Sequence, residues 1–232
     1  MGSNLPTQPV IRLHLGHPRW NTTLKAVWLR MGMLLCSAHF CFGQALSDDL
    51  LDHGAKLEAR QKAQGLTALI AAADRGHADV VKLLLDRGAD VNARRTDGGA
   101  TALIQAAGNG HTGAVKLLLD KGAGAVIDAK GLYGATALMP AAQNGHLDTV
   151  ALLLAAGANQ NETSDGGYTP FILAAQDGRD DVLDLLLGKQ VNLDQQTEDG
   201  HTALMLAAQN GHAFATSILI ERGAVTVQVL LA

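Results

Sequence analysis

The chain has 232 residues and a formal net charge of −4 at pH 7, with 18 basic and 22 acidic residues. Four of the basic residues and none of the acidic ones lie in residues 1–47, so the remainder has a net charge of −8. An acidic body gains nothing from the counterion release that drives nucleic-acid binding, and we expect no nucleic-acid partner. Aromatic residues make up 3% and hydrophobic residues 47%, which favours closely packed helices with small and aliphatic side chains between them.

Residues 1–45 form a basic leader that contains an apolar run and ends in Gly43-Gln-Ala45. A basic stretch, an apolar stretch and a small-x-small site are the three parts of a secretory signal, which predicts cleavage after Ala45 and export to the periplasm or the medium. A mitochondrial transit peptide and a disordered extension of a cytoplasmic protein are the alternatives. No stable membrane span is expected, because the apolar segment 26–42 is shorter than the roughly 20 residues needed and contains ionisable side chains.

One phrase recurs five times after the leader. Each copy begins at a threonine, and the residue that closes it stands 21 positions later. The intervals between the threonines are 34, 35, 33 and 33 residues, for Thr67, Thr101, Thr136, Thr169 and Thr202. Helical units of this length cannot each bury a core of their own, so this period predicts an all-α repeat solenoid in which every unit packs on its neighbours.

Several parts follow one another along the chain, and each repeat is predicted to be a helix-turn-helix unit. In repeat 2, Thr101 can cap a first helix that ends at Gly110 in the left-handed conformation. A second, mainly apolar helix follows and is closed by Gly122. The predicted parts are the leader (1–45), an N-terminal half repeat that caps the stack (46–63), repeat 1 (64–97), repeat 2 (98–132), repeat 3 (133–165), repeat 4 (166–198), repeat 5 (199–228) and a tail (229–232).

Two repeats and all the connectors depart from strict repetition. Pro140 lies four residues after Thr136, where it removes the first hydrogen bond of the helix, so we expect repeat 3 to be locally the weakest. Gln190 replaces the closing glycine of repeat 4, so this residue must adopt a positive φ or the helix must end differently. The closing position of one unit and the capping threonine of the next lie 13, 13, 14, 12 and 12 positions apart, so the length varies only in the connectors, which predicts that the connectors project into solvent.

The repeated pattern G-x-T-A-L-x-x-A-A-x-x-G-H, followed by LLL-x-x-G-A, resembles the ankyrin repeat, most closely at 67–92 and 199–212. The resemblance covers residues 46 to about 228. It implies stacked helix-turn-helix units joined by β-hairpin-like fingers. It also implies a concave face, formed by the fingers and the first helices, that binds another protein. The usual Thr-Pro pair of the family is kept only at Thr169-Pro170.

The connector tips carry the residues that we expect to contact a partner, because they vary where the helices stay constant. Tyr133 and Tyr168 are the only tyrosines of the chain, and tyrosine is a frequent anchor of protein interfaces. The alternative is that both rings simply cover neighbouring fingers. The predicted partner-binding residues are Arg94, Arg95, Asp97, Tyr133, Asp165, Tyr168, Glu198 and His201.

Other motifs are better explained by structure than by chemistry. The histidine row of the repeats would place its members about 8 to 10 Å apart, too far to share a metal ion, so we expect structural hydrogen bonds at the turn between helices. The row consists of His77, His111, His146 and His212, with Arg179 in the fourth place. The glycine pattern Gly108-x-Gly110-x-x-Gly113 matches a dinucleotide fingerprint but follows a helix instead of a strand.

These observations predict a protein that is not an enzyme and has no catalytic, metal or cofactor site. The function we expect is a protein-binding scaffold, or a regulatory or inhibitory module, that uses the concave face of the solenoid. The alternative is an exported structural or chaperone-like envelope protein without a single defined partner. The C-terminal residues 225–230 alternate like a strand, which predicts either a cover over the last repeat or self-association through this end.

Overall fold

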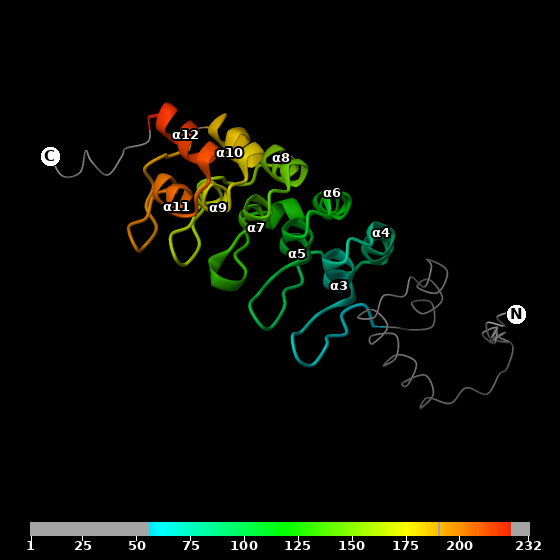
Figure 1. The fold of residues 1–232 in the computed structure, drawn as a ribbon. Helices are drawn as coiled ribbons and strands as arrows, with labels where there is room; N and C mark the ends of the chain where they lie inside the picture. The colour runs from blue at the N-terminus through cyan, green and yellow to red at the C-terminus, as the bar shows by residue number, and fades with distance from the viewer. Residues whose placement is uncertain (1–55, 190, 224–232) are drawn as a thin grey trace, which may run out of the picture. The chain divides into compact units, whose positions relative to one another are not determined.

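The computed structural model describes residues 56–189 and 191–223. Within them the chain forms ten α-helices and two short 3-10 helices, and the repeats stack into the predicted all-α solenoid (Figure 1). The predictions for the leader, for most of the half repeat, for Gln190 and for the tail lie outside the described residues.

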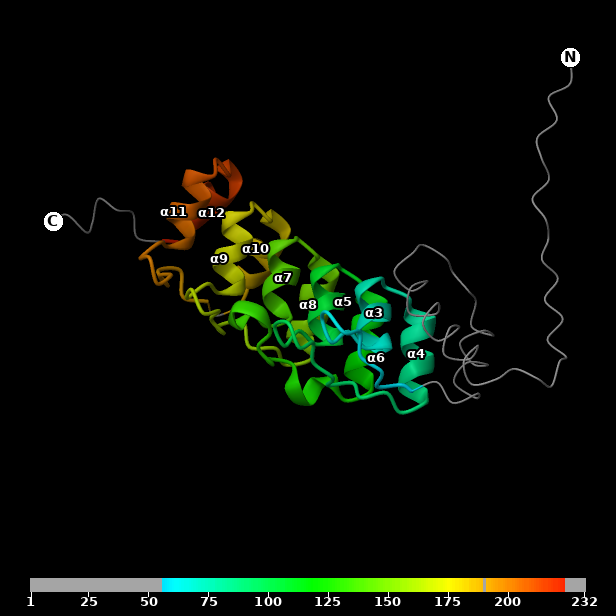
Figure 2. The same ribbon diagram turned by 90° about the horizontal axis from the view of Figure 1, so that it is seen from below.

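Each repeat contributes a first helix and a second helix, joined by a turn of three residues. The two kinds of helix form two layers, with the connectors projecting from the layer of first helices (Figures 1 and 2). The first helices are α3 (Ala68–Asp74), α5 (Ala102–Gly108), α7 (Leu138–Gln143), α9 (Pro170–Gln176) and α11 (Ala203–Gln209). The second helices are α4 (Ala78–Asp86), α6 (Thr112–Asp120), α8 (Leu147–Ala155), α10 (Asp180–Leu187) and α12 (Ala213–Glu221).

Threonine side chains cap four of the five first helices. The hydroxyl accepts a hydrogen bond of 3.2 to 3.3 Å from the backbone N–H three residues later, and the threonine itself is buried. This bond satisfies one of the N–H groups that a helix start leaves without an intrahelical partner. The predicted cap is therefore confirmed for Thr67, Thr101, Thr169 and Thr202.

The predicted cap is wrong for repeat 3. Helix α7 begins at Leu138 and has six residues instead of seven, and the buried hydroxyl of Thr136 has no hydrogen-bond partner in the described part of the chain. Pro140 is the reason, because it lacks the N–H that the threonine carbonyl accepts in the other repeats. The carbonyl of Thr136 instead accepts the N–H of Met139, at 3.3 Å, so that N–H does not reach the hydroxyl.

Helix α10 of repeat 4 also ends early. It has eight residues, whereas the other second helices have nine, and Gly188 follows it with a right-handed φ of −66°. The other second helices are closed by a glycine with a φ between 87° and 104° two residues after the last helical residue. Repeat 4 thus ends its second helix one residue earlier than the other repeats, and the φ of Gln190 lies outside the described residues.

Alanine and leucine fill the interior as the composition indicates. Two consecutive alanines are almost fully buried in each of the first helices α3, α5, α7 and α9, because a methyl side chain lets two helices approach closely. One leucine of each second helix is also buried, and each contributes about 1.5 to 3 kcal/mol to folding. These leucines are Leu84, Leu118, Leu153, Leu186 and Leu219, at 0% to 5% exposure.

The histidine row ties successive repeats together. The Nε2–H groups of His111 and His146 donate to backbone carbonyls at the end of the preceding first helix, at 3.1 and 3.0 Å. The guanidinium of Arg179 does the same at 2.8 Å. The prediction of structural hydrogen bonds is thereby confirmed for these three residues. Gly110 is required beside His146, because its φ is 71° and an added Cβ would lie 2.5 Å from the ring.

The connectors form five fingers: finger 1 (56–66), finger 2 (89–100), finger 3 (123–135), finger 4 (158–168) and finger 5 (191–201). A backbone hydrogen bond closes each tip, but the described residues contain no strand, and Arg94 and Thr101 form a single isolated β-bridge. The hairpin-like fingers are therefore tight turns without a β-ladder.

The extra length of finger 3 lies at its base and not at its tip. The 3-10 helix η1 (Ala123–Val126) takes up the additional residues next to α6, and Ala123 and Ile127 are buried there. A second 3-10 helix, η2 (Leu132–Gly134), forms the tip. The prediction that the connectors project into solvent is correct for the tips but wrong for the base of finger 3.

Candidate protein-binding surface

The five fingers lie side by side in chain order (Figure 1). Backbone hydrogen bonds join three of the four neighbouring pairs: fingers 1 and 2, fingers 3 and 4, and fingers 4 and 5. The bonds run from Thr96 N–H to the carbonyl of Gln64, from Asp165 N–H to that of Tyr133 and from Glu198 N–H to that of Gly166, at 2.9 to 3.1 Å. Fingers 2 and 3 are joined instead by the Arg94 side chain, which donates to the carbonyl of Lys130, so contacts connect all five fingers.

A relay of basic side chains joins fingers 1 to 4. Arg60 donates to the carbonyl of Arg94 at 2.6 Å, and Arg94 donates to the carbonyl of Lys130. Lys130 donates in turn to the carbonyl of Thr163 at 2.9 Å. The relay stops at finger 4, because Thr163 occupies the position of the basic residue and is too short to reach the next finger.

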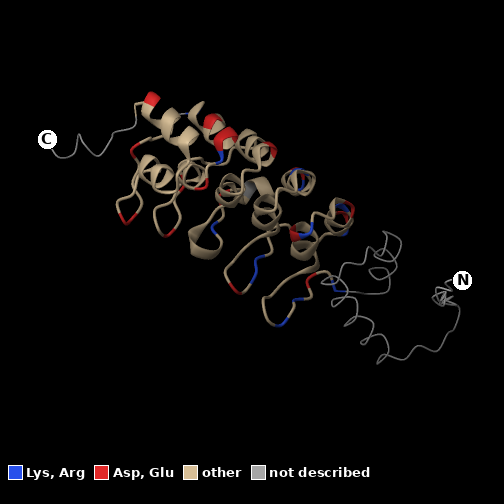
Figure 3. Cartoon of the chain, viewed as in Figure 1, with Lys and Arg blue, Asp and Glu red and all other residues tan. Residues whose placement is uncertain are grey.

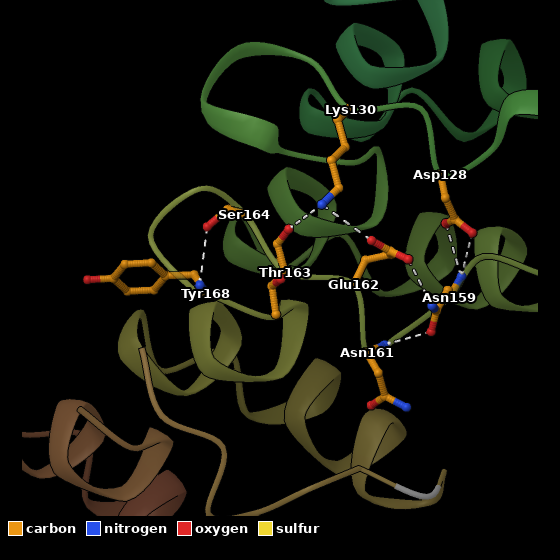
Figure 4. A network of polar contacts seen from close by, with 8 residues as sticks. All are labelled: Asp128, Lys130, Asn159, Asn161, Glu162, Thr163, Ser164 and Tyr168. Atoms are coloured by element: carbon orange, nitrogen blue, oxygen red, sulfur yellow. Dashed lines mark hydrogen bonds and ion pairs between the residues drawn. The ribbon is translucent and has the colours of Figure 1, made fainter. Parts of the chain in front are cut away.

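Polar contacts between fingers 3 and 4 strengthen this relay (Figure 4). The ammonium of Lys130 lies 3.5 Å from the carboxylate of Glu162, and the carboxylate of Asp128 accepts the backbone N–H of Asn159 at 3.0 Å. The Asn161 carboxamide points away from the Lys130–Glu162 pair in this view. Finger 4 is thus fixed on the side that faces finger 3.

All eight predicted partner-binding residues lie on fingers 2 to 5. Tyr133 and Asp165 are brought together by their backbone hydrogen bond, and the ring of Tyr168 lies beside Gly166 of its own finger. Arg95 and Asp97 are engaged with each other at 2.5 Å, and this bond lowers the pKa of Asp97. Arg94, Asp97, Tyr133, Asp165 and Glu198 are exposed, and Arg95, Tyr168 and His201 are half-buried.

Tyr133 combines exposure with a strained backbone. It is 75% exposed and has a φ of 56°, the single positive value of a non-glycine residue in the described part of the chain. A left-handed conformation costs a bulky residue about 1 to 2 kcal/mol, and such strain persists only where the surroundings fix it. Its neighbour Leu132 is 50% exposed and lies against Gly98 of finger 2. The tip of finger 3 therefore presents an apolar pair to solvent.

Charge changes along the row of fingers. The net charges of fingers 1 to 5 are +2, 0, 0, −2 and −3 with histidine counted as neutral, and Figure 3 shows basic residues on the N-terminal fingers and acidic residues on the C-terminal ones. The basic side chains Arg60, Arg94 and Lys130 are used in contacts between fingers. Asp165, Glu198 and Asp199 form no ion pair with any described residue.

Comparison with known proteins agrees with this architecture. A family model described as "Ankyrin repeats (3 copies)" matches residues 93–164 and 138–229, and one described as "Ankyrin repeat" matches residues 64–96. The chain belongs to the ankyrin repeat family. Ankyrin repeats are generally scaffolds for protein–protein interaction and are typically not enzymes. A search of curated proteins found no match to this chain.

One feature of this ankyrin repeat surface was not predicted from the sequence. A pocket of about 290 Å³ lies between fingers 4 and 5, lined by Asn161, Thr169, Phe171, Val191, Asn192 and Gln195. The sequence signal that could have indicated this pocket is Thr163, which stands where fingers 1 to 3 have a basic residue.

The described ankyrin repeats contain no cluster of three or more His, Cys, Asp or Glu side chains arranged to hold a metal ion. Two members of the histidine row, His111 and His146, use their Nε2 atoms for hydrogen bonds to backbone carbonyls. In the same residues, no helix has the length and apolar character needed to cross a bilayer.

Proposed function

We propose that this ankyrin repeat protein is a scaffold, or a regulatory or inhibitory module, that binds another protein through the row of fingers and the adjoining first helices. The observation that carries the proposal is the tip of finger 3, where Leu132 and a strained Tyr133 are exposed in the middle of the row. An exposed aromatic residue with its backbone held in place loses little entropy on binding, which suits an interface anchor.

Crosslinking of the purified chain in native extract, followed by affinity measurement with the recovered protein, tests this proposal. Replacement of Tyr133 by alanine should weaken the complex by more than about 1 kcal/mol while leaving the melting temperature nearly unchanged, because Tyr133 is 75% exposed. Tyr168→Ala should also weaken the complex but should lower the melting temperature, because Tyr168 packs against the core. Leu147→Ala is the matched control, because Leu147 is also exposed but lies at the start of α8, away from the fingers. Equal affinity of both tyrosine variants and the wild type would refute the finger surface.

The alternative function predicts a different result in the same experiment. A structural or chaperone-like envelope protein would give weak binding to many proteins, and neither tyrosine would matter. The proposal of export is tested separately by sequencing the N-terminus of the mature chain. A start at Leu46 supports a cleaved signal, and an intact Met1 in a cytosolic fraction rejects it.

We also propose that copies of the chain associate through the end of repeat 5. Ala208 is exposed there, whereas its counterparts in the other four repeats have 0% exposure, and Ile220 is 51% exposed. Sedimentation should show an oligomer that Ile220→Asp dissociates, and the charged variant should leave the unfolding transition in place. A wild-type chain that is monomeric at every concentration would reject this proposal.

A further inference from the structure

The pocket between fingers 4 and 5 exists where the relay of basic side chains is missing. Arg60, Arg94 and Lys130 each reach the backbone of the following finger. The equivalent residue of finger 4 is Thr163, which makes no such contact with finger 5 in the described residues. The base of these two fingers therefore stays separated by a pocket of about 290 Å³, although their tips are joined by the Glu198–Gly166 bond.

The lining of the pocket has an apolar part and a polar part. Phe171, which is 2% exposed, and Val191 provide the apolar wall. Three carboxamides, those of Asn161, Asn192 and Gln195, provide the polar part. The size is at the lower limit of ligand pockets, which are about 300 to 1,000 Å³, so the pocket suits one long side chain better than a whole small molecule.

The carboxamide oxygens of Asn161 and Gln195 are available as hydrogen-bond acceptors, whereas that of Asn192 already accepts the N–H of Asp194 at 3.1 Å. The amide group of Gln195 donates to the carbonyl of Gln196 at 3.1 Å, so the Gln195 oxygen is the atom left to bind a ligand. The side chain of Asn161 makes no hydrogen bond with a described residue, and Figure 4 shows it directed away from the finger 3 contacts. Acceptor oxygens beside an apolar wall fit a donor at the end of an alkyl chain.

The electrostatic surroundings select a positive donor. Fingers 4 and 5 together carry five acidic residues and no Lys or Arg, and Asp165, Glu198 and Asp199 form no ion pair with a described residue. The nearest cation along the chain is Lys189, which precedes finger 5 and is exposed. A net charge of −5 on the two fingers attracts a cationic group and repels an anionic one.

We propose that this pocket receives a lysine or arginine side chain of the partner protein, with the alkyl stem on Phe171 and Val191 and the charged end at the carboxamide oxygens. The acidic residues Asp165, Glu198 and Asp199 supply the surrounding field. This inference rests on the proposed protein-binding function and gives the partner a chemical character: a positively charged segment that crosses fingers 4 and 5.

A peptide titration followed by NMR tests the pocket without knowledge of the partner. The probe is acetyl-Gly-Ala-Lys-Ala-Gly-amide, and its control carries Nε-acetyl-lysine, which keeps the stem but removes the charge. The lysine peptide should shift the side-chain amide signals of Asn161, Asn192 and Gln195 in a saturable manner, and the acetylated peptide should bind at least tenfold more weakly. Equal shifts with both peptides, or shifts confined to other residues, would overturn the proposal.

Two sets of variants locate the effect. Asn161→Leu should reduce the affinity for the lysine peptide at least fivefold, because it removes a carboxamide from the rim. The pair Glu198→Gln and Asp199→Asn should reduce it at least threefold and flatten its salt dependence. The pair Asp79→Asn and Asp148→Asn changes the charge equally on the second helices and should have no effect. An equal loss in both pairs would show general attraction by the acidic body and would overturn a localised pocket.

The two proposals fail in different ways. If Tyr133→Ala abolishes binding of the crosslinked partner while the peptides give no response at the pocket, the scaffold proposal stands and the cation pocket is wrong. If the peptides respond at the pocket but no protein binds the finger row, the pocket is real and the scaffold proposal is wrong.

Discussion

Repeats 2 and 3 share one phrase but differ in how their first helices begin. In repeat 2 the hydroxyl of Thr101 caps α5, and its carbonyl accepts the N–H of Gln105. In repeat 3 Pro140 stands in the place of Gln105, and the identical residue Thr136 does not cap the helix and has no partner for its hydroxyl among the described residues. The hydroxyl caps the helix in the four repeats in which the residue four positions later donates to the threonine carbonyl, and it does not do so in repeat 3.

The largest effect is expected from Pro140→Ala, which removes this difference. The new N–H of residue 140 can donate to the carbonyl of Thr136. This releases the N–H of Met139, which can then donate to the Thr136 hydroxyl. We expect the free energy of unfolding to rise by about 1 to 3 kcal/mol, reduced by the entropy that proline removes from the unfolded chain. Urea denaturation measures this. A loss of stability would show that the contact of Pro140 with Gly108 of repeat 2 outweighs the missing cap.

The second prediction compares the two threonines directly. Thr101→Val removes a hydroxyl that caps a helix and should cost about 0.5 to 2 kcal/mol. Thr136→Val removes a buried hydroxyl without a partner and should be neutral or stabilising. Both residues are nearly fully buried, at 3% and 0% exposure, so the two substitutions are matched in packing. Equal losses, measured by denaturant unfolding, would contradict the assignment of Thr136 as uncapped.

This comparison also shows what the sequence could predict. The helix pairs, the left-handed glycines and the role of His111 and His146 followed from residue type and period, because they depend on contacts that recur between neighbouring repeats. The base of finger 3 and the pocket beside Asn161 did not follow. They depend on how two neighbouring fingers of different sequence meet, and a period contains no information on such a contact.

The third prediction concerns a feature that repeats 2 and 3 share. His111 and His146 each donate to a carbonyl of the preceding first helix, at 3.1 and 3.0 Å. Replacement of either by alanine should cost about 0.5 to 1.5 kcal/mol, the usual net contribution of one hydrogen bond. If thermal or urea unfolding shows equal losses of stability for the two variants, the uncapped start of α7 is the single weak point of repeat 3. A much smaller loss for His146→Ala would mean that the whole junction between repeats 2 and 3 is loose.

The smallest change in stability is expected from a substitution at the end of a second helix. The junctions between neighbouring repeats also differ there. Asp86 of repeat 1 accepts hydrogen bonds from Lys121 of repeat 2 at 2.7 Å and from Lys82 at 2.6 Å, and these bonds lower its pKa from 3.8 to about 2. The corresponding pair at the next junction is Asp120 and Ala156, which cannot form an ion pair.

Because the pKa of Asp86 is lower in the folded state, its carboxylate stabilises the fold above about pH 4, and this contribution is lost as the pH falls through the folded-state pKa of about 2. Asp86→Asn should therefore lower the urea midpoint at pH 7, by less than any variant above, and most of this difference from the wild type should have disappeared at pH 2. Asp120→Asn is the control, because Asp120 forms no ion pair with a described residue. A wild-type advantage over Asp86→Asn that persists unchanged at pH 2 would show that shape and not charge is what matters at this junction.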